Sequence, residues 1–134
     1  MLDLLINSLR MRPDRIILGE MRKQEEATVL FEAMHTGHSV YATVHADSIT
    51  ATIQRLTNPP IEVPGNLLSA INLVVVMFRN RRLNTRRVSQ IGELLHSEDE
   101  HETTIRQNLL YRWNPLTDKI VRHQKPIRLF EELS

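Results

Sequence analysis

The chain has 134 residues, of which 41% are hydrophobic and 25% charged, which suits a single globular domain and excludes wholesale disorder. Its 17 Lys and Arg residues against 16 Asp and Glu residues leave a net charge of +1, so no overall field favours nucleic acid or an anionic membrane. Because it holds no cysteine, disulfides, cysteine nucleophiles, thiolate zinc sites and iron–sulfur ligation are excluded.

The first part of the chain alternates between helical and strand patterns. Apolar residues spaced as one stripe predict a helix over residues 2–9, which Pro13 ends. The uninterrupted apolar run Ile16–Leu18 is typical of a strand buried on both faces, as in a parallel sheet. A second helical stripe covers residues 27–34, and Gly37 stands just beyond it, where helix ends favour glycine.

The alternation continues after this helix. Val40–Val44 is rich in β-branched and aromatic residues and predicts a second strand. A third helical stripe runs over residues 49–56, and either Asp47 or Ser48 is suited to cap its first turn. Strand, helix, strand and helix in this order form a βαβ unit, which implies two parallel strands joined by a right-handed crossover.

The second half of the chain is patterned as an antiparallel hairpin. Pro64 is suited to open a short helix that extends to residue 71, and Leu73–Phe78 predicts a further buried strand. The turn-like pair Asn84-Thr85 leads into a polar-interleaved stretch over residues 88–94, which favours a hairpin with the preceding strand.

The remaining residues favour a second hairpin. Residues 97–102 are acidic, and we expect them to form a loop. Two strand-like stretches, residues 105–113 and 119–123, flank the turn-rich sequence NPLTD over residues 114–118. The last segment, residues 127–133, predicts a short helix. The fold class that we expect is therefore α/β, a parallel βαβ unit followed by antiparallel β-hairpins.

Two polar residues follow the two predicted parallel strands. Glu20 comes after the first strand, and His45 comes directly after the second. Because the carboxyl ends of parallel strands open on one edge of a sheet, where ligands bind, we expect this carboxylate and this imidazole to share one crevice. In nucleotide hydrolases an acidic residue at such a place holds Mg²⁺, but Glu20 also fits a plain structural role as the charge partner of Arg22.

The histidines admit more than one interpretation. Imidazole is a common zinc ligand, but His38 and His45 are expected at opposite ends of one strand, too far apart for one metal ion. A histidine that faces phosphate or a neighbouring subunit suits the pattern better, and a satisfied structural histidine is the simpler alternative.

The densest basic cluster follows the strand predicted at residues 73–78. It consists of Arg79, Arg81, Arg82, Arg86 and Arg87. On a hairpin such a cluster suits contact with nucleic acid. A solvated face or a subunit interface is favoured instead, because the chain is nearly neutral and few aromatic residues accompany the cluster.

Two segments of the chain resemble one known family. Residues 9–22, LRMRPDRIILGEMR, resemble the Walker B segment of the secretion ATPases. That family drives type II secretion, type IV pilus assembly and retraction, type IV secretion and the archaeal flagellum. Residues 36–46, TGHSVYATVHA, look like its histidine box, and a single helix separates the two motifs, as in the family. The resemblance covers residues 2–57 and, more loosely, residues 73–94.

The resemblance implies a partial RecA-like P-loop NTPase core. Residues 1–95 would be the C-terminal part of the RecA-like ATPase domain, and residues 96–134 would add a β-hairpin and a short helix to the same compact body. Glu20 would be the Walker B acid, holding Mg²⁺ through water. His45 would contact the γ-phosphate region and His38 would support the histidine box, while Arg22 would be a charge partner near the site.

The phosphate-binding loop of that family does not occur in this sequence. The motif G-x-x-x-x-G-K-[ST] is absent, and the four glycines, at positions 19, 37, 65 and 92, cannot form it. Without that loop and its lysine, we expect this chain alone to bind neither ATP nor Mg²⁺ tightly and to show no ATPase turnover. We therefore expect a C-terminal fragment of a motor, or the product of a truncated gene.

Two functional hypotheses follow. In the first, the chain contributes to a hexameric motor ATPase whose complete form uses ATP and Mg²⁺ and has no nucleic-acid partner. The longest apolar run, Leu73–Phe78, is far shorter than the roughly 20 residues of a membrane helix. The resemblance implies that the motor is cytoplasmic and reaches the membrane through an inner-membrane platform protein. In the second, the chain is a non-catalytic interaction module, a truncated paralogue that docks on the motor or on itself.

Overall fold

The computed structural model describes residues 2–99 and 102–133 and divides the chain into two compact units. The first unit comprises residues 1–45 and 53–70, and the second comprises residues 46–52 and 71–134. The division at residue 95 that the resemblance implies falls inside a single strand, Thr85–Asp99, and it stays a prediction.

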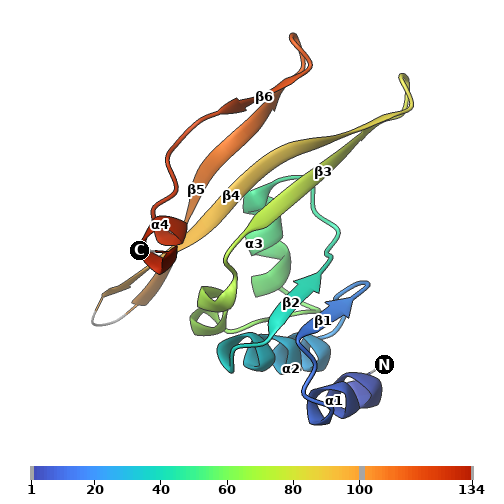
Figure 1. The fold of residues 1–134 in the computed structure, drawn as a ribbon, viewed down its shortest axis with the longest axis vertical. Coiled ribbons are helices and arrows are strands. Elements are labelled where there is room, and N and C mark those ends of the chain that lie inside the picture. The colour runs from blue at the N-terminus through green and yellow to red at the C-terminus, as the bar shows by residue number, and fades with distance from the viewer. Residues whose placement is uncertain (1, 100–101, 134) are drawn as a thin grey trace. The chain divides into compact units, whose positions relative to one another are not determined.

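The first unit contains the predicted βαβ arrangement (Figure 1). Helix α1, Leu2–Arg10, precedes strand β1, Arg15–Leu18, and helix α2, Gln24–His35, connects β1 to strand β2, Ser39–Ala42. The two strands pair in parallel, with Arg15 opposite Ser39 and Leu18 opposite Ala42. The α/β fold class and the parallel strand pair are therefore confirmed.

The core of this unit forms around α2. Its most deeply buried side chains, each at most 2% exposed, are Ala27, Leu30, Phe31, Ala33, Leu56, Ile61 and Leu68. Burying one large apolar side chain of this kind contributes about 1.5–3 kcal/mol relative to leaving it in water. The helical stripe that the sequence shows is thus the face that holds the unit together.

The expectation that β1 is buried on both faces is wrong. Ile16 and Leu18 are buried, but Ile17 between them is 79% exposed. Tyr41, which pairs with Ile17 on the neighbouring strand, is 60% exposed. Successive side chains of a strand point to opposite faces, and among the described residues no element covers the second face of this two-stranded sheet.

Local turn chemistry ends α2 and begins α3, Ile49–Thr57. Gly37 has φ +91°, and the N–H groups of Gly37 and His38 donate to the carbonyls of Met34 (3.1 Å) and Ala33 (3.0 Å). This pair of bonds satisfies the last carbonyls of α2 and needs a backbone that glycine adopts easily. At the start of α3, the Ser48 hydroxyl accepts a hydrogen bond from the N–H of Ala51 at 3.1 Å, so Ser48 is the cap.

The segment expected as a helix opened by Pro64 forms a 3₁₀ helix, η1, Gly65–Ala70. The second unit then contains a four-stranded antiparallel sheet in the order β3-β4-β5-β6 (Figure 1). The strands are Val74–Asn80, Thr85–Asp99, Glu102–Asn114 and Lys119–Arg122, and helix α4, Arg128–Leu133, follows them. Both predicted hairpins and the final helix are therefore confirmed.

Two expectations for this sheet are wrong. Residues 97–102 were expected as a loop, but β4 continues to Asp99 and β5 begins at Glu102; residues 100–101 lie outside the described residues. The ladder extends because Ser97 pairs with Thr104, next to β-branched residues that favour strands. Strand β3 was expected to be buried, yet of its residues only Val76 is buried, because β3 is an edge strand with β4 as its sole neighbour.

A buried carboxylate organises the second unit. Glu93 on β4 is fully buried and accepts hydrogen bonds from Asn108 Nδ2 at 2.7 Å, from the Ile127 N–H at 2.6 Å and from the Leu129 N–H at 3.2 Å. Burial acts to raise the pKa of Glu93, but these hydrogen bonds outweigh it, and the pKa lies below its ordinary value. The ionised side chain therefore ties the start of α4 to the sheet.

Among the described helices, none is both long enough and apolar enough to cross a bilayer.

Candidate functional site

The loops that follow β1 and β2 are tied together by Thr43. Its hydroxyl donates a hydrogen bond to the carbonyl of Gly19, and its own carbonyl accepts one from the N–H of Met21 at 3.0 Å. These two hydrogen bonds continue the contact between the two backbone segments beyond Leu18 and Ala42, the last paired residues of β1 and β2. As a result, Glu20 and His45 leave the sheet side by side.

The Glu20 carboxylate lies between two nitrogen-bearing side chains. Its Oε1 is 2.9 Å from Nε2 of His45, and its Oε2 accepts from Arg22 Nε at 2.6 Å and from Nη2 at 2.5 Å. The side chain of Glu20 is 22% exposed, whereas that of His45 is 84% exposed. The expectation that this carboxylate and this imidazole share one edge is confirmed, and so is the pairing of Glu20 with Arg22.

The electrostatics of the cluster keep Glu20 ionised. The hydrogen bonds from Arg22 lower the pKa of Glu20 below its ordinary value, partial burial opposes this, and the charges of Arg22, His45 and Arg55 lower it further. Reciprocally, the hydrogen bond to Glu20 raises the pKa of Arg22. A carboxylate held in this state is a poor proton acceptor and a suitable partner for a cation.

The structure does not bring His38 to this cluster. His38 precedes β2, at the end opposite His45, and its Nδ1 lies 3.2 Å from the Ala33 carbonyl and 3.2 Å from the Thr36 hydroxyl. These contacts place His38 at the end of α2. Its predicted role in supporting the histidine box stays a prediction.

Two residues near the site escape a pattern-based analysis. Thr43 ties the loops together, and Arg55 on α3 contributes to the low pKa of Glu20. The sequence signal for Thr43 is a polar residue inside the strand-like run before His45. Arg55 lies on a helix with an ordinary amphipathic pattern, which carries no signal for its place near Glu20.

The donor set limits the metals that this cluster suits. Among residues 2–99 and 102–133, no group of three or more His, Cys, Asp or Glu side chains is placed to hold a metal ion. Glu20 offers one carboxylate, whose Oε2 accepts a hydrogen bond from Arg22 and whose Oε1 lies 2.9 Å from Nε2 of His45. Mg²⁺ prefers oxygen ligands and keeps several of its waters, so the single carboxylate fits Mg²⁺ contacted through water.

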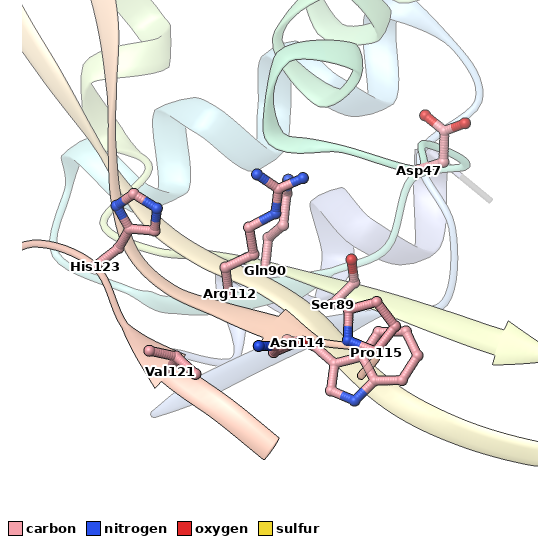
Figure 2. A pocket seen from close by; sticks show the side chains of 9 residues that line it. Asp47, Ser89, Gln90, Arg112, Asn114, Pro115, Val121 and His123 are labelled. Atoms are coloured by element: carbon pink, nitrogen blue, oxygen red, sulfur yellow. The ribbon is translucent and has the colours of Figure 1, made fainter. Parts of the chain in front are cut away.

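The second unit has a cavity of its own, of about 590 Å³ (Figure 2). It is lined by Asp47, Ser89, Gln90, Arg112, Trp113, Asn114, Pro115, Val121 and His123. Figure 2 shows Asp47 apart from the side chains of Gln90 and Arg112. Asp47, Arg112 and His123 are all exposed, so the charged residues that line this cavity are open to solvent.

Comparison with known proteins identifies the family to which this sequence is similar. Residues 1–114 match the family model described as Type II/IV secretion system protein. An uncharacterized protein of Methanocaldococcus jannaschii is 38% identical over 120 residues, which are 88% of this chain and 44% of that protein. The type IV pilus assembly ATPase PilB of Pseudomonas aeruginosa is 36% identical over 113 residues, 84% of this chain and 18% of that protein.

A solved structure shows the same likeness. The Legionella pneumophila ATPase DotB matches with a TM-score of 0.53 and 27% sequence identity, over 70% of this chain and 27% of that chain. The chain therefore spans less than half the length of the relatives that it matches.

Proposed function

Because the chain belongs to the type II/IV secretion system protein family, we propose that it forms part of an ATP-driven motor for protein export or filament assembly. The observation that carries this proposal is the cluster of Glu20, Arg22 and His45 at the carboxyl ends of two parallel strands. Ligands of open α/β sheets bind at this edge. The similarity to PilB and to the DotB ATPase supports nucleotide chemistry there.

In this proposal each residue of the cluster has a separate role. Glu20 is the Walker B acid and contacts Mg²⁺ through water, because its ionised carboxylate is partly exposed while Arg22 and His45 already contact its two oxygens. His45 contacts the γ-phosphate region, since its exposed ring stands beside that carboxylate. Arg22 balances the charge of Glu20 in the absence of the cation. His38 supports the histidine box through its contact at the end of α2.

The phosphate-binding loop would come from residues other than these 134. Phosphoryl transfer depends on a cradle of backbone N–H groups and a lysine around the phosphates, and this sequence has no such motif. We propose that this chain alone does not turn over ATP. The complete motor is a hexamer on the cytoplasmic side of the membrane, where a platform protein holds it, and it serves a secretion, pilus or archaeal flagellar apparatus.

The missing loop also supports a second candidate function, a non-catalytic module. Such a module docks on the motor or on a copy of itself and makes no use of nucleotide. In that case Glu20 and Arg22 form a structural ion pair, and His45 has no chemical role.

A chimera separates the two functions. Residues 1–114 of this chain replace the matching segment of full-length Pseudomonas aeruginosa PilB, and ATP hydrolysis is measured with Mg²⁺. The motor proposal expects hydrolysis that falls about 100-fold with Glu20→Gln, the size of effect seen when a key electrostatic group is lost. Glu25→Gln, at an exposed position of the same unit, is the matched control and keeps the activity.

The outcomes of this experiment are distinct. A folded, assembled chimera without hydrolysis supports the non-catalytic module. Hydrolysis that survives Glu20→Gln refutes the role assigned to Glu20. Turnover by residues 1–134 alone, lost in the Glu20→Gln variant, refutes the view that this chain needs a phosphate-binding loop from elsewhere.

A further inference from the structure

The sheet of the second unit has two turns at the same end (Figure 1). One joins β3 to β4 around residues 80–85, and the other joins β5 to β6 around residues 114–119. They lie at the same end because β4 and β5 are adjacent and antiparallel, with Gln90 opposite Arg112. We call residues 79–87 and 114–122 the hairpin end.

Side-chain contacts join the two turns into one surface. Arg87 donates to both carboxylate oxygens of Asp118 at 2.8 Å, and the indole N–H of Trp113 donates to the same carboxylate at 3.0 Å. The rings of Phe78 and Trp113 pack against each other at a tilt of 30°, with their centroids 5.5 Å apart. A bidentate arginine–carboxylate pair with an aromatic contact beside it fixes the relative position of the turns.

The hairpin end carries most of the positive charge of the second unit. Its basic residues are Arg79, Arg81, Arg82, Arg86, Arg87, Lys119 and Arg122, and its single acidic residue is Asp118. Arg87 neutralises Asp118, and the structure shows no ion-pair partner for the other six among the described residues. Since the whole chain carries only +1, the rest of it is net negative.

Each turn also presents a leucine to solvent. Leu83 is 71% exposed and Leu116 is 93% exposed. Both turns are ordered by an asparagine: Asn80 accepts from the N–H of Leu83 at 3.2 Å, and Asn114 accepts from the N–H of Leu116 at 2.9 Å. A single exposed leucine needs no explanation, but two at the tips of adjoining basic turns form an amphipathic surface.

We propose that the hairpin end binds the surface of a bilayer whose headgroups carry negatively charged phosphate. The arginines and Lys119 contact the phosphates, while Leu83 and Leu116 enter the boundary between headgroups and acyl chains. The net negative charge of the rest of the chain orients the hairpin end toward such a surface. This inference goes beyond the motor proposal, since it involves neither nucleotide nor the Glu20 cluster.

A bilayer fits this surface better than nucleic acid does. Proteins that bind single strands stack bases on free aromatic faces. In the hairpin end and its flank, Phe78 and Trp113 pack against each other as a tilted pair, so part of each ring is already in contact with the other. The two exposed leucines have no counterpart in a phosphate backbone and a direct one in the acyl region of a membrane.

Vesicle sedimentation with the full chain tests the proposal. We expect binding to vesicles of phosphatidylglycerol mixed with phosphatidylcholine, and none to phosphatidylcholine alone. The double variant Arg81→Gln/Arg82→Gln is expected to bind about tenfold more weakly, and added salt to weaken binding further. The control Arg10→Gln/Arg15→Gln removes the same charge from exposed positions of the first unit and keeps the binding.

A second pair of variants distinguishes a bilayer from other polyanions. Leu83→Ser/Leu116→Ser is expected to weaken vesicle binding at least severalfold while leaving retention on immobilised heparin unchanged. The proposal is overturned if neutral and anionic vesicles bind alike, if the two arginine pairs behave alike, or if the leucine variant binds vesicles as well as the parent. Retention on DNA stronger than on anionic vesicles overturns it too, in favour of a nucleic-acid site.

Discussion

Nε2 of His45 lies 2.9 Å from Oε1 of Glu20, although a whole helix and a strand separate these residues in the sequence. The contact follows from topology, because two parallel strands deliver the residues after their carboxyl ends to one edge of the sheet. The hydrogen bonds of Thr43 then bring the two loops close enough for the side chains to meet.

Removal of Arg22 tests the charge balance of this cluster. Because the hydrogen bond from Arg22 is the largest cause of the low pKa of Glu20, Arg22→Gln is expected to move that pKa back toward its ordinary value. Carboxylate carbon chemical shifts followed by NMR over a pH titration measure this. Arg10→Gln is the control. A Glu20 that titrates identically in both variants shows that Arg22 is not its partner in solution.

Stability at low pH is expected to depend on Glu93. Its pKa is lower in the folded chain than in the unfolded chain, where it is about 4.3, so its contribution is full above that value and is lost as pH falls through the folded pKa. Glu93→Gln is expected to lower the free energy of unfolding at neutral pH by about 2 kcal/mol, because it places an NH₂ group against N–H donors. Chemical denaturation measured between about pH 7 and pH 3 tests both expectations.

Two comparisons make that test specific. Glu25→Gln changes an exposed residue and should leave the unfolding free energy within about 0.5 kcal/mol. Hydrogen exchange at the amides of Ile127 and Leu129 should accelerate in the Glu93→Gln variant, because Glu93 accepts from both. Unchanged protection of these amides would contradict the anchoring role of the carboxylate.

Gly92 is a site where the sheet leaves little room for a side chain. A Cβ there would lie 2.5 Å from Cδ1 of Ile49 and 3.0 Å from the carbonyl oxygen of Asn108. Gly92→Ala is therefore expected to destabilise the fold by about 1–3 kcal/mol, as overpacking of a core does. Thermal or chemical unfolding measures this loss.

Two further substitutions make the Gly92→Ala test specific, one expected to compensate for it and one expected to be neutral. Ile49→Val removes the atom nearest to the new methyl group and should recover part of the stability when combined with Gly92→Ala. Gly65→Ala meets no atom within 4 Å and should be almost neutral. Equal effects of the two glycine substitutions would show that Gly92 is not tightly packed in solution.

The contact between the two hairpins can be followed through Asp118. The hydrogen bond from Arg87 and the indole N–H of Trp113 lower the pKa of Asp118 to about 2. Arg87→Gln is expected to raise it toward the ordinary value of about 3.9. Because the chain has one tryptophan, its fluorescence reports the protonation of the carboxylate that its indole contacts. A fluorescence titration that does not move with Arg87→Gln would refute this link.

Much of the first unit could be predicted from the sequence, because pattern and turn chemistry agree there. The apolar stripe of α2, the strand-like run before His45 and the glycine at position 37 all indicate the same arrangement. The exposure of Ile17 and Val75 could not be predicted in this way. An apolar run indicates that a strand forms, but the number of layers that cover it depends on elements elsewhere in the structure.

The candidate site was predictable to the same extent. Strand order was enough to place Glu20 beside His45, and proximity along the chain was enough to pair Glu20 with Arg22. Arg55 acts across the fold, so spacing along its helix carries no sign of it, and Thr43 is marked only as a polar residue inside a strand-like run. Glu93 likewise stands in the sequence as an ordinary charged residue of a strand, and only the N–H groups of a distant segment explain its burial.

During synthesis of the chain, Glu93 is made before the groups that donate hydrogen bonds to it. Its partners are a side chain from β5 and backbone groups at the start of α4, which leave the ribosome long after β4. Until Leu129 emerges, the nascent sheet must keep this carboxylate hydrated. A polypeptide that stops short of Ile127 therefore lacks the two backbone N–H donors that offset the burial of this charge.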